Sequence, residues 1–232
     1  SNAETPTAGD WYGLRVLSSS KLVMKYAKVE YDVYGVYATG NSNATDTVQV
    51  ENSRFRIGGT ALQANDLYSR RLLFKGNTLE GAGISGSWLS SVLIKNNIIT
   101  GNLNFTGINL HFYSSGSDGC EVSGNIVKKC DNGITINSSG NPVLMITDNV
   151  VDSCQYQGIY VGNFSSVVMK GNRISNSQYN SIGNYGISIE SGSSLSNVQI
   201  RNNIIAANRS SGIYLNHTTG VIDSNQVTNN QG

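Results

Sequence analysis

The chain has little charge, little proline and little cysteine. Its 232 residues carry 16 Lys and Arg against 15 Asp and Glu, a net charge of +1, and charged residues make up 13%, about half the share usual in soluble domains. This balance lacks the basic excess of an electrostatic nucleic-acid binder, so we expect no nucleic-acid partner. No apolar run approaches the roughly 20 residues that a membrane span needs, so we expect no membrane-spanning segment. The three cysteines are too few for a disulfide framework.

The chain is instead rich in glycine and asparagine, with 26 and 29 residues, and two phrases built on them recur. The first is an apolar-x-apolar stretch, two further residues, a position that is usually Asn, one more residue and an aliphatic. The second phrase is Gly-aliphatic-x-aliphatic, and it alternates with the first. The Asn position holds Ala27, Ser53, Asn77, Asn97, Asn125, Asn149, Asn172, Asn203 and Asn225. The Gly position holds Gly13, Gly35, Ala61, Gly83, Gly107, Gly133, Gly158, Gly186 and Gly212.

Nine copies of each phrase follow one another at intervals of mostly 20 to 28 residues. That period is too short for a propeller blade and contains no helix of the ankyrin or leucine-rich kind. Short alternating stretches between Gly, Asn and Ser turns predict strands, and stacked copies would bury their aliphatic side chains in one continuous column.

From Trp11 to Asn230 the chain therefore resembles the right-handed parallel β-helix families, the pectate-lyase-like superfamily in its broad sense. The opening Trp11-Tyr12-Gly13-Leu14 is also similar to the start of β-helix modules in secreted bacterial surface proteins. We expect an all-β fold, a right-handed single-stranded parallel β-helix (solenoid) of about nine coils with three short strands per coil. The handedness rests on the resemblance and on the general crossover rule. The resemblance also implies an extracellular, cell-surface or periplasmic location.

We expect one domain. Residues 1–3, Ser-Asn-Ala, are typical of the remnant of a cleaved tag, and residues 4–232 form the β-helix. Neither end of the repeat carries a recognisable cap, and natural solenoids normally cover their terminal strands. The domain is therefore expected to be a segment of a longer protein, with neighbouring domains of the same polypeptide as partners.

Aligning the copies converts the sequence into columns along the rod. The aliphatic column that runs from Val29 to Val227 is unbroken and must point inward. The next column alternates in charge, as in Glu30, Arg56 and Glu80 and then in Lys128 and Asp152, which predicts surface salt bridges between coils rather than catalytic acids or calcium ligands. A small polar column follows at a turn. It places Cys130 and Cys154 one coil apart, about 4.8 Å, which favours stacked thiols and leaves a disulfide as the alternative.

Two outward rows lie beside the Asn position. One is a basic stripe, suited to a polyanionic glycan or simply to a solvated edge that resists aggregation. Beside it runs an apolar row, which suggests cover by another segment, domain or subunit. The basic stripe consists of Lys25, Lys75, Lys95, Lys170 and Arg201. The apolar row consists of Val23, Leu73, Leu93, Met145, Val168 and Val221.

Residues for catalysis are sparse. The resemblance implies clustered aspartates for calcium with an Arg or Lys base in lyases, or aspartates with a Gly-His-Gly in hydrolases, and neither pattern occurs. The remaining catalytic candidates are Arg15, His111 and Asp118, the last in a long loop for which an ordinary corner insertion is the favoured interpretation. We expect no metal site and no cofactor; calcium is a candidate cofactor only if the protein is a lyase.

A row of aromatic and amide side chains on the Gly-phrase strand suits sugar binding, because rings stack on sugar faces while polar groups bind hydroxyls. The alternative is ordinary strand decoration. The candidate carbohydrate-binding residues are Tyr37, Asn109, His111, Tyr160, Glu190 and Tyr214. These patterns favour a non-catalytic extracellular module that binds a polysaccharide, another glycan or a protein partner. The alternative, implied by the resemblance alone, is a polysaccharide lyase or epimerase acting on polyuronates.

Overall fold

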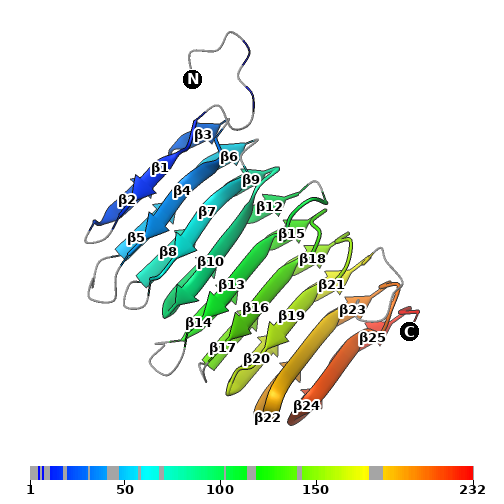
Figure 1. Ribbon diagram of the computed structural model, residues 1–232. Coiled ribbons are helices and arrows are strands. Elements are labelled where there is room, and N and C mark those ends of the chain that lie inside the picture. Colours follow the sequence, from blue (N-terminus) through cyan, green and yellow to red (C-terminus); the bar gives the residue numbers. More distant parts are fainter. Residues whose placement is uncertain are drawn as a thin grey trace.

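A computed structural model describes residues 5, 7, 11–17, 20–30, 32–40, 47–56, 59–67, 71–101, 103–113, 119–139, 143–177 and 185–231, with backbone alone at 193–196. Within these residues the chain forms 25 strands. Figure 1 shows them stacked coil upon coil into a rod. The expected tag remnant, residues 1–3, lies outside the described residues.

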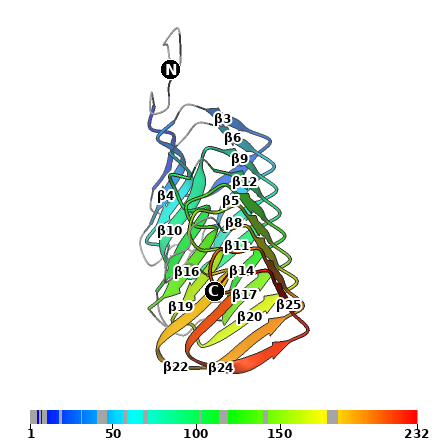
Figure 2. The same ribbon diagram turned by 90° about the vertical axis from the view of Figure 1, so that its right-hand side faces the viewer.

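The strands form three parallel stacks, each strand pairing with its counterpart in the next coil (Figures 1 and 2). The first stack contains β1 (Leu14–Val16), β4 (Tyr34–Thr39), β7 (Thr60–Asn65), β10 (Gly83–Leu89), β13 (Ile108–Phe112), β16 (Ile134–Ser138), β19 (Ile159–Gly162), β22 (Ile187–Arg201) and β24 (Ile213–Asp223). The second contains β2 (Leu22–Lys25), β5 (Thr47–Glu51), β8 (Arg71–Lys75), β11 (Ser91–Lys95), β14 (Cys120–Ser123), β17 (Val143–Thr147) and β20 (Ser166–Lys170), followed by the distal halves of β22 and β24. The third contains β3 (Lys28–Glu30), β6 (Arg54–Arg56), β9 (Thr78–Glu80), β12 (Ile98–Thr100), β15 (Ile126–Lys128), β18 (Val150–Asp152), β21 (Arg173–Ser175), β23 (Ile204–Ala206) and β25 (Gln226–Thr228).

The coil count matches the expectation: nine rungs, with eight full turns between the first and the last. Three strands per coil hold only for the first seven coils. In the last two coils the first and second strands merge into β22 and β24, which joins the two stacks into one 16-stranded sheet. The pairing of Leu195 with Thr218 carries the ladder around this corner, so no break separates the two strands.

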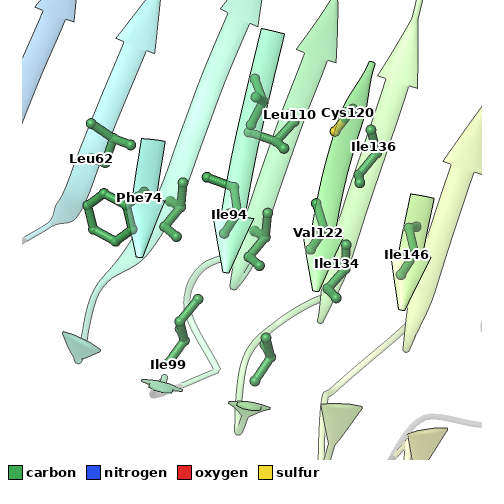
Figure 3. Packing of buried hydrophobic residues seen from close by; sticks show 14 of the residues in the cluster. Leu62, Phe74, Ile94, Ile99, Leu110, Cys120, Val122, Ile134, Ile136 and Ile146 are labelled. Carbon is green, nitrogen blue, oxygen red and sulfur yellow. The ribbon is translucent and has the colours of Figure 1, made fainter. Parts of the chain in front are cut away.

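Inward side chains from all three stacks meet in one apolar column. Strands of the second stack alternate between exposed or half-buried and buried positions, as the period of two requires. Figure 3 shows Ile94 of β11, Ile99 of β12 and Leu110 of β13 in this shared core. The column expected to point inward is buried from Val29 to Ile205, and only Val227 in the last coil is exposed.

The recurrent Asn forms a buried ladder along the corner between the second and third stacks. The Oδ1 of Asn125 accepts hydrogen bonds from the backbone N–H and the Nδ2 of Asn97, both at 2.9 Å. The Nδ2 of Asn125 donates to the Ile94 carbonyl and to the Oδ1 of Asn149, both at 3.0 Å. The pattern repeats in the neighbouring coils, so the amide repeat satisfies the corner backbone between coils.

The expected charge ladder forms between the second and third coils only in part. Arg54 and Arg56 both approach the Glu80 carboxylate, at 2.7 and 3.9 Å. Glu30 instead pairs at 2.8 Å with Lys28 of its own strand. Because each pair has a cation that is about half exposed or more, solvent screens the pairs and they contribute little to stability.

Farther along the same column, Asp152 is held by hydrogen bonds rather than by an ion pair. Its Oδ1 accepts from Ser175 Oγ and Asn176 Nδ2, both at 2.7 Å. Burial raises the pKa of Asp152, but these bonds, one from Ser153 and the charge of Lys128 outweigh it and lower the pKa below its usual range. The expectation of a Lys128–Asp152 bridge was therefore wrong in its detail, because neutral donors lie closer.

Cys130 and Cys154 are buried and unbonded, as the preference for stacked thiols predicted. Each sulfur lies near the carbonyl two residues before it, at 3.4 and 3.8 Å. Burial raises the pKa of each thiol to about 12. Both thiols are therefore protonated at neutral pH and unsuited to act as nucleophiles.

Asp32 is a buried carboxyl next to Trp11, with which it forms an isolated bridge. Its Oδ2 has no hydrogen-bond partner among the described residues. Burial raises the pKa of Asp32, partly offset by a backbone hydrogen bond, so ionisation destabilises the folded state.

Asp32→Asn is therefore expected to stabilise the protein at neutral pH. With a raised folded-state pKa, the stability from this carboxyl is present in acid and is lost as pH rises through that pKa. Denaturant unfolding at several pH values should show the gain growing with pH. Asp148→Asn, at an exposed turn, is the control. An equal gain at all pH values in the acidic range would contradict the explanation.

Candidate functional site

The candidate sugar-binding row lies on the outer surface of the first stack. The pairing register places its members side by side, one in each coil, as the alignment predicted. Within the row Ser188 is buried between Tyr160 and Tyr214 of the neighbouring coils, and its hydroxyl donates to Glu190. From the first coil to the ninth the row reads Arg15, Tyr37, Gln63, Ser85, Asn109, Thr135, Tyr160, Ser188 and Tyr214.

A second polar row lies two residues farther along the same strands. His111 pairs with Asn137, and Glu190 with Asn216, which confirms the expected register. In the third and fourth coils the Oδ1 of Asn65 accepts from Gln63 Nε2 and from Ser87 Oγ, at 2.8 and 2.9 Å. In these two coils the amides and hydroxyls of the two rows thus fix one another.

Trp88 interrupts this surface in the middle of the rod. It occupies a β-bulge in β10, where the register shifts between Gly86 and Leu89, and its φ is 57°. Its ring lies 5.8 Å from His111 and 4.9 Å from Tyr113, centroid to centroid. Trp88 is 37% and Tyr113 is 46% exposed. These three rings, here called the Trp88 cluster, form an aromatic platform beside Asn109.

Two further aromatic groups lie on the same stack, one toward each end. In the first two coils the rings of Tyr12, Tyr34 and Tyr37 contact one another at 5.2 to 6.0 Å. The guanidinium of Arg15 lies over Tyr12 and Tyr37, at 5.1 and 5.8 Å. In the last coils Tyr185 stacks on Tyr214 with centroids 4.3 Å apart.

A small hollow of about 190 Å³ lies at the upstream edge of the polar rows. It is lined by backbone and side chains at the start of β7, β10 and β13. Gln63, Ser85 and Asn109 contribute the polar groups, and Phe105 contributes an apolar wall. Its polar groups and single ring provide donors and acceptors for a hydroxylated ligand.

The catalytic candidates do not come together. Arg15 lies in the first coil and His111 in the fifth, roughly 19 Å apart at the usual strand spacing. Arg15 is engaged with tyrosine rings, and His111 Nε2 lies 3.0 Å from Ser139 Oγ. Asp118 lies outside the described residues. The paired arrangement that acid–base catalysis needs is therefore not formed by Arg15 and His111.

In the part of the chain that the structure describes, no three His, Cys, Asp or Glu side chains are grouped to hold a metal ion. Several carboxylates are already paired. Glu51 forms an ion pair with Lys25 at 3.1 Å, and hydrogen bonds from Lys25 and Gln49 lower the pKa of Glu51. Glu121 pairs with Lys95 at 3.4 Å.

The basic stripe lies on the second stack, away from the aromatic row. The register confirms that its positions align, but the charge is interrupted. Glu51 separates Lys25 from Lys75, and Ser123 and Thr147 separate Lys95 from Lys170. A continuous cationic track for a polyanion is therefore absent over these described strands.

Sequence reasoning missed Trp88 and Tyr113. The bulge adds a residue to β10, which shifts Trp88 out of the two-residue alternation on which the rows were aligned. The available signal was an extra residue between two regular copies, with an aromatic side chain at that place. Tyr12, Tyr34 and Tyr185 were likewise missed, because they flank the aligned row rather than occupy it.

The family model described as the right-handed beta helix region matches residues 8–194 and, in a second overlapping match, residues 132–232. No curated protein and no solved structure matches the chain. Among the described residues no helix is long and apolar enough to cross a bilayer.

Proposed function

The chain belongs to the right-handed β-helix family, and from this premise we propose that it is a non-catalytic extracellular module that binds glycan along the outer surface of the first stack. The Trp88 cluster beside Asn109 is the observation that carries the proposal. Exposed rings next to amides are the combination that sugar recognition uses, since sugars offer both apolar ring faces and hydroxyl edges.

The surface around this platform favours an uncharged glycan. In coils 3 to 6 the two polar rows offer amides and hydroxyls, with His111 as the one titratable side chain among their described members. Formal charges on the rows lie toward the ends, at Arg15 and Glu190. A polyuronate would gain little electrostatic attraction here, whereas neutral hydroxyls match the available donors and acceptors. The members in these coils are Gln63, Asn65, Ser85, Ser87, Asn109, His111, Thr135 and Asn137.

The repeat supports a polymeric rather than a single-sugar ligand. Each coil presents the same row about 4.8 Å farther along the rod, so successive residues of a chain lying parallel to the axis meet equivalent positions. Aromatic rings recur at Tyr37, Trp88, Tyr160 and Tyr214 along this track. Weak contacts at several coils would then add up within one bound chain.

Trp88→Ala is expected to weaken glycan binding about tenfold, the loss that corresponds to roughly 1.4 kcal/mol of aromatic contact. Glycans are first identified on an array of neutral and anionic oligosaccharides, and affinities are then measured by calorimetry. Tyr26→Ala is the matched control, because Tyr26 is highly exposed but lies at the corner between the second and third stacks. Absence of binding to any glycan, or equal losses in both variants, would contradict the proposal.

A degradation assay separates this proposal from the lyase and epimerase alternative. Polyuronates incubated with the protein, with and without calcium, are expected to show no rise in absorbance from unsaturated products and no change in uronate epimer composition by NMR. Formation of either product would show that the module is catalytic. Arg15, His111 and the unplaced Asp118 would then be the first residues to replace.

A further inference from the structure

The outer surface of the second stack carries the apolar row, which the glycan proposal does not use. The register aligns its six apolar members with three polar ones, Gln49, Glu121 and Gln199, to make one row across the nine rungs from β2 to β24. Val23, Met145 and Val221 are 50%, 44% and 45% exposed. An aligned apolar row of this length on an open sheet face is a typical interaction surface.

The row is hollowed in the middle of the rod. A groove of about 440 Å³ is lined by Leu93, Val143 and Met145, with Arg71 and Glu121 as charged members. The groove opens on the strands around β14, the fifth of the nine rungs. A partner side chain can therefore enter close to the centre of the face.

The residue types along this row read the same from either end. Its first and last members are both valine, and its three polar members are Gln49 in the second coil, Glu121 in the fifth and Gln199 in the eighth. The remaining positions pair Leu73 with Val168 and Leu93 with Met145 about the fifth coil. The row is thus symmetric in chemistry about β14.

The row that contains the basic stripe shows a related symmetry in charge. The first coil has Lys25 where the ninth has Asp223, and the second has Glu51 where the eighth has Arg201. Opposite charges thus occupy positions equidistant from the centre at both ends. The third and seventh coils carry Lys75 and Lys170, a like-charged pair that departs from this pattern and lies at the last residues of β8 and β20, on the edge of the face.

We propose that the second-stack face pairs with the same face of a second copy, forming an isologous dimer. A twofold axis parallel to the strands through the fifth coil lays the first coil over the ninth and each row over itself. Valine then meets valine, glutamine meets glutamine, and Lys25 and Glu51 meet Asp223 and Arg201 of the other copy. Near the axis the Glu121 carboxylates of the two copies approach each other. Each remains in its ion pair with Lys95 at 3.4 Å, and this positive charge offsets the repulsion between the carboxylates.

The face is large enough for a specific dimer. Nine strands at about 4.8 Å spacing and five residues of about 3.3 Å give roughly 700 Å² per copy. The total of about 1,400 Å² falls within the usual range for stable protein–protein interfaces. Two sheets packed face to face with aligned strands are also a common arrangement.

Sedimentation over a concentration series tests the dimer and its face. Leu93→Asp is expected to raise the dissociation constant at least about 100-fold, because it places a charge in the central groove of both copies. Ile98→Asp is the matched control, an exposed aliphatic in the same coil but on the third stack, and it should leave association unchanged. A monomer at all concentrations, or a dimer equally sensitive to both changes, would overturn the proposal.

Charge exchange and cross-linking test the orientation. Arg201→Glu should weaken association about tenfold, and adding Glu51→Arg should restore it to within about threefold of the original. A zero-length carbodiimide reagent should join Lys25 to Asp223. Within one chain these residues lie eight coils apart, roughly 38 Å, so this product forms only between copies. Failure of the exchange to restore association, or a dimer without this cross-link, would overturn the antiparallel arrangement.

Discussion

Gly133→Ala is expected to destabilise the rod by about 3 kcal/mol or more. A Cβ at this position would lie 2.4 Å from the Gly158 carbonyl oxygen and 2.3 Å from Val151 Cγ1. That oxygen cannot retreat freely, because it accepts a hydrogen bond from the Ile134 N–H at 2.9 Å. The added methyl must therefore push two coils apart at a corner where their backbones are directly bonded.

The measurement is denaturant and thermal unfolding of the variant beside Gly192→Ala. Gly192 is exposed, and its nearest non-neighbouring atom to an added Cβ is Asn163 Oδ1 at 3.6 Å, an ordinary contact. The control should change stability by at most about 0.5 kcal/mol, whereas Gly133→Ala should lower Tm by roughly 6 to 12 °C. Similar small effects in both variants would show that the corner tolerates a side chain.

The third coil shows how the fold accommodates the exception at this position. Ala61 occupies it there, and the pairing of β7 with β10 skips one residue, from Thr60 with Gly83 to Leu62 with Ile84. Ala61 thus has no residue paired to it in the following strand. The recurrent glycine follows from the close approach of coils, and the one alanine coincides with a local slip.

The sequence allowed the repeat, the inward column and the register of the outward rows to be predicted, because all three depend on a side-chain period of two within copies of similar length. The Asn repeat was visible as a pattern, but its bonds between coils depend on a corner geometry that spacing alone does not reveal. The merging of strands in β22 and β24 was likewise not predictable, since it depends on hydrogen bonds around the corner rather than on side-chain type.

The candidate site was predicted less completely than the fold. Tyr37, Asn109, Tyr160 and Tyr214 lie in the row as expected, but the main aromatic platform depends on Trp88, which a bulge places outside the alignment. The ion pairs also differ from the predicted ladder, because a long side chain can pair within its own strand, as Lys28 does with Glu30. Irregular backbone and flexible charged groups are the features that a repeat pattern specifies least.

The second large effect on stability is expected from the Asn ladder. There the loss comes from polar groups left without hydrogen bonds rather than from a change in side-chain volume. Replacing Asn125 with leucine keeps a side chain of similar size but removes the acceptor of the Asn97 N–H and Nδ2 and one donor to the Ile94 carbonyl, all inside the rod. Each buried group left without a hydrogen bond costs about 1 to 3 kcal/mol. We expect Asn125→Leu to lower the free energy of unfolding by about 4 kcal/mol.

Two further variants separate the ladder from the general cost of changing a corner residue. Asn225 lies in the last rung and is only partly buried, so water can replace its bonds, and Asn225→Leu should cost about 1 kcal/mol. Asn125→Ser should fall between the two leucine variants. The protein uses the same solution in its second coil, where Ser53 Oγ accepts from the Ala27 N–H at 3.0 Å and donates to the Glu51 carbonyl at 2.9 Å. Equal losses in all three, measured by denaturant unfolding, would mean that packing rather than the amide ladder holds the corner.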